Sequence, residues 1–537
     1  MIIRTKKSPR LLGLDEPIRH ENHKKPVTRR DFIAQGMRTG PAIIAAPAAL
    51  GLLLQASKAG AMSPDLEALL LPDTQPGGLC NVQAGAGKVP FICFDLAGGA
   101  NLNGSEILLG ANGDPLNFLS TAGYAKLGLP GNMTPASTTA DFVNEEFGAA
   151  WHSDGAILRG MQMSTAVTTR AKVNGFPIAA RSENDTGNNP HNPMYGINRI
   201  GARGQLLTLI GSQNTDSGGN SMAPASLMNP AARPTKVDRA SDVTGLVDTG
   251  ELGTLFANQD DAIAVLESMT RLSHSKADMA MSQFNLANNT DEEALRKLVK
   301  CGYLKSTYLA DRFRTPSALN PDLDPEIVGT TGIFTSAEYN GDGEFRKAAA
   351  IMKMVINGYA GAGTITMGGF DYHGQGRNTG ETRNFRAGRC IGACLEYAAR
   401  MGKPLMIYVF SDGALSANGV TNMTAEGRGK LDWASDNQAT AATFVLVYKP
   451  TGKPEFRTTR KQIGSYSTGG DVVTSSAPSA NAVNLLVETV LLNYMALHGE
   501  EANFPTLFPT HGLGGNAARD GLTIIQPVCS GTVSTPV

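Results

Sequence analysis

Short apolar runs that end in glycine or polar turns alternate with longer amphipathic segments through most of this chain. The run at 90–96 ends at Ala97-Gly98-Gly99, a pattern typical of a buried strand closed by a glycine turn. Similar runs predict strands at 156–159, 205–210, 363–367, 405–410 and 443–448. Apolar residues at three- and four-residue spacing predict helices at 260–275, 292–313, 344–359, 384–400 and 480–497. The alternation predicts an α/β fold whose central sheet is mostly parallel and covered by helices on both faces.

The same pattern predicts one domain rather than two. No internal repeat and no low-complexity linker divides residues 80–530, so we expect a single α/β domain over 62–537 with a core at about 88–500. Long stretches rich in Gly, Asn, Thr and Pro at 97–150 and 176–250 are expected to be insertions in this domain. Loops of that length are more often functional than decorative.

The first 61 residues have the pattern of a cleavable export signal. Arg29 and Arg30 form a twin-arginine pair, the stretch 39–57 carries no charge, and Ala59 and Ala61 are small residues at the two positions that a signal peptidase recognises. The twin-arginine translocase is therefore the first partner that we expect. The sequence predicts a protein of the periplasm or cell envelope that is exported already folded. The alternative is an uncleaved membrane helix, since nineteen uncharged residues could just span a bilayer.

Removal of residues 1–61 makes the chain acidic. This segment holds 11 basic and 4 acidic residues, so the remainder has 36 basic and 44 acidic residues and a formal charge near −8. A chain with that charge is not expected to bind nucleic acid or an anionic membrane surface. No transmembrane segment is expected after residue 61, because no later apolar run is long enough.

All six cysteines lie after residue 61, where an oxidising compartment permits disulfides. So few cysteines in a chain of this length do not form a disulfide scaffold, and most are expected to be small buried residues. Cys390 and Cys394 are four apart on a predicted helix, which is a poor geometry for a bridge. No CxxC motif occurs, so a thiolate zinc site is not expected.

Side chains with metal-binding chemistry follow two of the predicted strands. Asp371 and His373 come soon after the strand at 363–367, and Asp412 follows the strand at 405–410. Ligands bind at the carboxyl ends of strands in an open parallel sheet, so we expect these three side chains within reach of one ion. Mixed carboxylate and imidazole sets suit zinc, manganese or iron. The alternative is that the aspartates form turns or helix caps and that the histidine is a structural residue.

The order of these motifs resembles that of a known bacterial family. A twin-arginine signal is followed by a strand ending in Gly-Gly, a later strand with Asp-x-His, a helix, and a strand that ends at Ser411-Asp412-Gly413. This order is similar to that of the family called domain of unknown function 1501, a member of the alkaline phosphatase and sulfatase superfamily. The similarity covers most of residues 88–450 and is carried by residues 91–104, 369–375, 408–418 and 433–448. Relatives with a loop like that at 182–193 are often labelled general secretion pathway protein F, but that name belongs to a polytopic protein.

The resemblance implies an alkaline-phosphatase-like fold with a two-metal site that hydrolyses phosphate or sulfate esters. Asp371 and His373 match the family's Asp-x-His motif, and Asp412 matches the acidic residue after the later strand. Asp436 stands where the family has the aspartate of an Asp-His pair. These four residues are the candidate metal ligands.

The chain departs from the family pattern at two expected ligands. Asn101 replaces an acidic residue and Asn437 replaces the histidine of the Asp-His pair, and the loop at 411–414 lacks the usual arginine. Amides bind metals more weakly than carboxylates or imidazoles. We therefore expect a partly degenerate site that holds one divalent ion, zinc or manganese with calcium as the alternative. A second ion is expected to bind weakly or not at all.

Two further residues are candidates for catalysis. Ser105 follows the loop after the first strand and is a candidate nucleophile. His191, in the polar loop at 182–198, is a candidate to complete the site. The alternatives are an ordinary loop serine and a turn-forming segment rich in Asn and Pro.

The sequence leaves two functions open. The first is an exported, metal-dependent hydrolase of small phosphate or sulfate esters. The second is a non-catalytic envelope or secretion-associated protein that uses the same fold to bind or assemble with an envelope partner. The retained ligands favour the first and the two amides favour the second, so the sequence does not decide whether the chain is an enzyme.

Replacing Arg29 and Arg30 with Lys is expected to stop export and to leave an unprocessed precursor in the cytoplasm, because the translocase recognises the arginine pair. Immunoblots of periplasmic and cytoplasmic fractions measure this. The matched control replaces Arg4 and Arg10 with Lys and is expected to be exported normally. Periplasmic accumulation of the Arg29/Arg30 variant at the unsubstituted level would contradict the export assignment.

Overall fold

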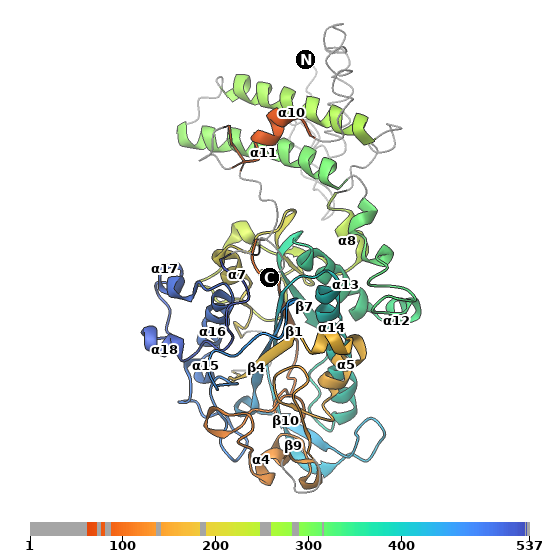
Figure 1. The fold of residues 1–537 in the computed structure, drawn as a ribbon, viewed down its shortest axis with the longest axis vertical. Helices are drawn as coiled ribbons and strands as arrows, with labels where there is room; N and C mark the ends of the chain where they lie inside the picture. Colours follow the sequence, from red (N-terminus) through yellow and green to blue (C-terminus); the bar gives the residue numbers. More distant parts are fainter. Residues whose placement is uncertain are drawn as a thin grey trace, which may run out of the picture.

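The computed structural model describes residues 62–71, 77–80, 87–135, 141–182, 189–247, 259–281, 289–313, 316–531 and 533. The predicted signal residues Arg29, Arg30, Ala59 and Ala61 lie outside this part of the chain. A seven-stranded sheet forms its centre (Figure 1), in the order β4-β11-β8-β1-β7-β5-β6. The strands are β1 (Phe91–Leu96), β4 (Val173–Ala179), β5 (Leu207–Gly211), β6 (Thr235–Lys236), β7 (Ala360–Met367), β8 (Leu405–Ser411) and β11 (Ala442–Tyr448).

All strands of this sheet except β11 run in the same direction. β1 pairs in parallel with β7 and β8, and β5 pairs in parallel with β6 and β7. β11 runs antiparallel to both of its neighbours, β8 and β4. The sheet is thus mostly parallel, which confirms the prediction. β1 is buried along its whole length, as expected for a strand that is covered on both faces.

Helices cover both faces of the sheet (Figure 1). One face packs against α5 (Ala156–Ser164), α13 (Gly343–Ile356) and α14 (Arg377–Arg400), and the other against α7 (Met194–Ile200) and α16 (Val483–Ala496). Alternation along β1 directs Phe94 into the first core and Phe91 into the second. The predicted coverage of both faces is confirmed.

The segment 156–159 begins helix α5, so its prediction as a strand is wrong. α5 packs closely against α14, since a Cβ at Gly160 would lie 2.2 Å from the carbonyl oxygen of Phe385. A Cβ at Gly388 would likewise lie 2.2 Å from the carbonyl oxygen of Ile157. A short apolar run does not distinguish a strand from a buried helix, and here tertiary packing decides.

The elements that the sequence does not predict include strand β4 and a β-hairpin. β4 contains Gly175 and Pro177, which are unfavourable inside a strand. β4 is the last strand of the sheet on its side, where it pairs with β11 and forms an isolated parallel bridge with Ile463. The hairpin of β9 (Leu415–Thr421) and β10 (Leu431–Asp436) forms a separate two-stranded sheet. This hairpin carries Asp436, so the site depends on an element that the sequence does not predict.

A helical hairpin of α10 (Gln259–Met281) and α11 (Asn289–Arg312) lies at one end of the molecule (Figure 1). Both helices match the predictions at 260–275 and 292–313. Residues of the short helix α3 (Pro64–Ala68) pack with α11, and a disulfide joins Cys80 to Cys301. No helix of the described residues is both long and apolar enough to cross a bilayer.

The other four cysteines are buried and unbridged, as the sequence predicts for most of them. They are Cys93, Cys390, Cys394 and Cys529. The remaining helices and strands in the described part of the chain are short. They are α4 (Thr121–Lys126), α6 (Val167–Arg170), α8 (Ala240–Thr244), α12 (Ser336–Gly341), α15 (Pro478–Asn481), α17 (Phe504–Leu507), α18 (Asn516–Asp520), β2 (Val143–Asn144) and β3 (Trp151–His152).

Gly388→Ala is expected to lower the free energy of unfolding by about 1–3 kcal/mol, because an added methyl group overpacks the contact between α5 and α14. Gly302→Ala in α11 is the matched control, since nothing lies within 4 Å of a Cβ at that position. The control is expected to be neutral or to stabilise by about 0.5–1 kcal/mol, because alanine is the better helix former. Urea unfolding measures both. Equal stabilities for the two variants would contradict this account of the packing.

Candidate metal centre and adjoining pocket

Three side chains from two separate segments form a group that could hold a metal ion. Asp371, His373 and Asp436 each offer one ligand atom, and these atoms lie within 4.8 Å of one another. The Nε2 atom of His373 is 2.9 Å from Oδ1 of Asp371. All three side chains are exposed. Two carboxylates and one imidazole are ligands that zinc and manganese accept.

Backbone pairing brings the loop after β7 to the end of β10. The amide of Gly374 donates to the carbonyl of Ala434 at 3.2 Å, and the amide of Gln375 donates to the carbonyl of Trp433 at 2.6 Å. Gly374 directly follows His373 in the chain, and Ala434 lies two residues before Asp436. The position of the third ligand therefore follows from main-chain hydrogen bonds between distant segments.

A glycine lets the loop after β1 approach the loop after β7. Gly98 has a φ of +133°, and a Cβ there would lie 2.1 Å from the backbone nitrogen of Asp371. Any side chain at this position would collide with the backbone that carries the first ligand. The Gly-Gly turn of the sequence thus has a steric purpose at the centre itself.

The buried side chain of Tyr372 anchors the loop that carries Asp371 and His373. Its hydroxyl accepts a hydrogen bond from the amide of Asn101 at 3.1 Å and donates to Oδ1 of Asn384 at 3.3 Å. The amide of Asn384 donates in turn to the buried Glu106 carboxyl at 2.8 Å. Burial raises the pKa of Glu106 above its ordinary value. With Tyr372 turned inward, its two neighbours in the chain, both of them ligands, lie exposed.

Asp412, which the sequence predicts as a ligand beside Asp371 and His373, is not a member of the group of three. Its carboxylate is buried, and it accepts hydrogen bonds from the amide of Gly98 at 2.8 Å and from Nδ2 of Asn220 at 3.0 Å. Asp412 therefore bonds to neighbouring loops instead of facing solvent with Asp371 and His373. The four predicted ligands thus divide into three that converge and one that does not.

Asp95, inside β1, is a buried carboxylate that the sequence analysis does not single out. Its Oδ2 accepts hydrogen bonds from the amides of Asn220 at 2.6 Å and Ser221 at 2.9 Å. Burial raises the pKa of Asp95, against the effect of these hydrogen bonds. Asp95 and Asp412 together hold the segment around Asn220 across the ends of β1 and β8. An acidic residue within an otherwise apolar strand is the signal that marks it in the sequence.

Both candidate catalytic residues are buried. Ser105 is fully buried, and its hydroxyl lies 3.5 Å from a guanidinium nitrogen of Arg377. His191 is 2% exposed, and its ring stacks on Phe410 at a centroid distance of 5.4 Å. Within the described part of the chain, neither ring nitrogen of His191 has a hydrogen-bond partner. Neither side chain is accessible to solvent, and the catalytic roles of Ser105 and His191 stay predictions.

The two amides that replace expected ligands make structural hydrogen bonds. The side-chain oxygen of Asn437 accepts from the amide of Ala439 at 3.0 Å and caps a short 3-10 helix. Asn101 is buried, and its Nδ2 donates to the carbonyl of Leu415 at 3.0 Å. Asn437 lies next to Asp436 in the chain, yet its side chain serves the backbone rather than the metal group.

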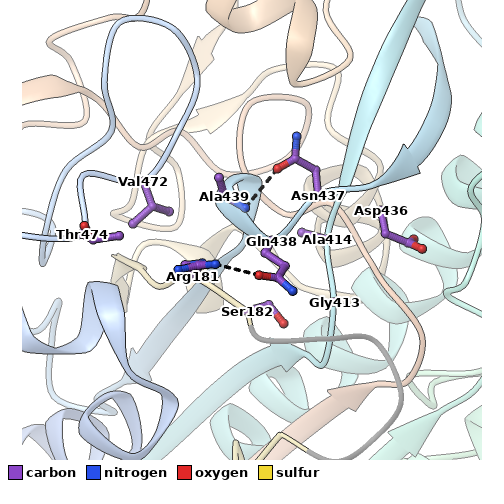
Figure 2. A pocket seen from close by; sticks show the side chains of 10 residues that line it. All are labelled: Arg181, Ser182, Gly413, Ala414, Asp436, Asn437, Gln438, Ala439, Val472 and Thr474. Atoms are coloured by element: carbon purple, nitrogen blue, oxygen red, sulfur yellow. Dashed lines mark hydrogen bonds between the residues drawn. The ribbon is translucent and has the colours of Figure 1, made fainter.

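A pocket of about 690 Å³ adjoins the group of three. It is lined by Arg181, Ser182, Gly413, Ala414, Asp436, Asn437, Gln438, Ala439, Val472 and Thr474. Figure 2 shows the Asp436 carboxylate at one side of the pocket and Thr474 at the other, with Arg181 and Gln438 between them. Arg181 donates to Oε1 of Gln438 at 2.9 Å and is the only cationic residue among the described residues of the lining. Asp436 therefore belongs both to the metal group and to the pocket.

No protein-family model, curated protein or solved structure matches this chain significantly. The resemblance described for the strand ends consequently stays a prediction. The three side chains of the candidate centre are assigned by their geometry and by the chemistry of their donor atoms.

Acid is expected to destabilise the folded chain partly through His191. Burial lowers the pKa of His191 to about 3, so the folded state keeps the ring neutral while the unfolded state takes up a proton near pH 6.5. The unfolded state therefore binds more protons between these values, and stability falls as the pH drops from about 6.5 toward 3. At pH 4.5 this amounts to about 2–3 kcal/mol relative to pH 7.

Urea unfolding of His191→Phe at the two pH values tests this expectation. Phenylalanine preserves the stack on Phe410 and cannot take up a proton, so the variant should lose less stability in acid than the unsubstituted chain. His152 and His498, whose pKa values burial lowers to about 4, should retain the rest of the acid dependence. An unchanged acid dependence in His191→Phe would contradict a neutral, buried His191.

Proposed function

We propose that this protein is an exported, metal-dependent hydrolase of small phosphate or sulfate esters with an alkaline-phosphatase-like fold. The observation that carries the proposal is the convergence of Asp371, His373 and Asp436 beside the pocket. The loop with the first two of these residues leaves the carboxyl end of a strand in a mostly parallel sheet, where ligands bind in such folds. The twin-arginine pattern of the sequence places the proposed reaction in the periplasm or cell envelope.

The donor set supports one divalent ion. Two carboxylates and an imidazole, completed by water, match the coordination of a catalytic zinc or manganese site with an open position. When bound, such an ion supplies Lewis-acid polarisation of a phosphoryl or sulfuryl oxygen. Asn437 is committed to its helix cap, which supports the expectation of one ion rather than two.

The pocket supports an anionic substrate of small size. A guanidinium presents a planar set of donors that suits phosphate and sulfate oxygens, and Arg181 is held in the lining by Gln438. We propose that Arg181 binds the anionic group of the ester while Asp371, His373 and Asp436 hold the ion. A volume of about 690 Å³ is within the range of small-molecule sites.

Slow turnover is expected from this site. Ser182 lines the pocket, but its side chain is buried and its hydroxyl donates to the carbonyl of Asp412 at 2.6 Å. Ser105 and His191 are buried elsewhere. We therefore propose that water attacks the ester, without the help of a covalent intermediate on the protein.

The alternative is a non-catalytic envelope protein that uses the same fold for binding or assembly. The exposure of all three candidate ligands favours it, because catalytic metals are usually enclosed by a shell of supporting residues. Metal binding separates the two functions, since the assembly protein has no need of an ion at these residues.

Titration of the exported protein with Zn²⁺ or Mn²⁺ by calorimetry is expected to give one tight site per chain. His373→Ala should weaken that site by more than the roughly 10–100-fold that loss of a supporting residue costs. His511→Ala is the matched control, because His511 lies outside the group, and it should bind like the unsubstituted protein. Hydrolysis of 4-nitrophenyl phosphate and sulfate should be slow and should disappear in His373→Ala. Fast hydrolysis that survives His373→Ala would contradict the proposal, and absence of a tight site would favour the assembly protein.

A further inference from the structure

Three apolar side chains that follow the predicted cleavage site, Met62, Leu66 and Leu70, are buried beside the α10–α11 hairpin. Met62 is 5% exposed and packs with Leu66 and Leu70 against Leu304 of α11. Cleavage after Ala61 would make Met62 the first residue of the chain, and an apolar contact there would be unusual because chain ends are normally exposed. The hairpin therefore packs against Met62 itself as well as against helix α3, which follows it.

Carboxylates from both helices of the hairpin face the backbone of this segment. The Met62 nitrogen lies 3.1 Å from Oδ2 of Asp311 and donates a hydrogen bond to it. The amide and the hydroxyl of Ser63 both donate to the Glu267 carboxylate at 2.5 Å. Glu267 is 3% exposed, and Arg271 pairs with it at 3.3 Å.

Cleavage after Ala61 would turn the Met62 nitrogen from an amide into an amino group. The Ala59-Gly60-Ala61 pattern predicts the cut at this bond. An α-amino group has an ordinary pKa near 8 and is therefore mostly positive at neutral pH. Cleavage would therefore replace an amide–carboxylate hydrogen bond to Asp311 with an ammonium–carboxylate ion pair, in which both partners are charged.

We propose that the amino group released by signal cleavage docks on the α10–α11 hairpin and pairs with Asp311, which makes this hairpin a binding site for the mature amino terminus. The proposal rests on export and on processing between Ala61 and Met62, and it does not depend on the metal centre. The ligand is the ammonium group of Met62 in the same chain, and the Met62 side chain packs against Leu304. Processing then stabilises the hairpin as well as removing the signal.

The disulfide limits the movement that this docking controls. Cys80 forms a disulfide with Cys301 of α11, so the chain around α3 stays attached to this helix even when Met62 dissociates from the hairpin. Opening of α3 and the residues beside it at 62–71 is therefore a local event, separate from unfolding of the sheet. Amide hydrogen exchange in α3 reports on such local opening directly.

Two variants of the exported protein test the proposal by hydrogen exchange and mass spectrometry. Asp311→Asn removes the carboxylate charge and keeps the shape of the side chain. Insertion of Asn-Gln between Ala61 and Met62 keeps the Ala59-x-Ala61 cleavage pattern, creates no new Ala-x-Ala site, and moves the ammonium away from Asp311. Each variant is expected to exchange the α3 amides about tenfold faster than the unsubstituted protein, the ratio that one ordinary charge-assisted contact provides. Asp278→Asn, at the far end of the hairpin where Asp278 pairs with Lys300, is the control and should leave α3 exchange unchanged.

Combining the two changes distinguishes an ion pair from a general disturbance. Asp311→Asn should add little in the background of the Asn-Gln insertion, because the ammonium is no longer beside it. Intact mass measurement must also give Met62 as the first residue of the exported, unsubstituted protein. A protein that begins at Met62 but shows unchanged α3 exchange in both variants would overturn the docking alone. A first residue other than Met62 would overturn both the processing site and the docking.

Discussion

Strand β1 pairs in parallel with β7 on one side and with β8 on the other, and the candidate metal centre depends on this arrangement. Parallel pairing brings the carboxyl ends of the three strands to one edge, so the loops that leave them meet. At Gly98 the approach is so close that a side chain would collide with the backbone of Asp371. The amide of the same glycine donates to the Asp412 carboxylate after β8. Gly98, in the loop after β1, therefore contacts both the loop after β7 and the loop after β8. These contacts help to position the loop that carries Asp371 and His373.

A buried charged network positions the third ligand from the side of the β9–β10 hairpin. The guanidinium of Arg377 in α14 lies 4.0 Å from the ring centroid of Trp433 in β10. Lys430, fully buried just before β10, pairs with Glu381 of α14 at 2.8 Å. Removing one member of a buried ion pair typically costs about 3–5 kcal/mol, because the partner is left unpaired. β10 ends at Asp436, so a substitution that disturbs this network is also expected to displace the Asp436 carboxylate. The neighbouring Glu106, whose pKa burial raises, belongs to the same region.

The sequence predicts much of this arrangement and fails where side-chain direction or long-range pairing decides. Asp371 and His373 are predicted because the Asp-x-His pattern follows the end of an apolar run, where a loop that leaves the strand can turn both side chains toward one ion. Asp412 follows a strand equally well, but no local pattern shows that neighbouring amides bond to its carboxylate. Asp436 reaches the group through the pairing of β10 with the loop after β7, and only the family resemblance indicates it. Strand β4 escapes prediction because its glycine and proline hide the strand pattern, whereas the central strands are plain apolar runs.

Asp371, His373 and Asp436 are proposed to share one ion. Anomalous X-ray diffraction at the zinc edge, from crystals of the exported protein grown with Zn²⁺, tests it most directly. The account predicts a single strong anomalous peak with bonds of about 2.0–2.2 Å to one atom of each of the three side chains. A strong peak elsewhere, or none beside these residues in a protein that binds zinc tightly, would contradict it.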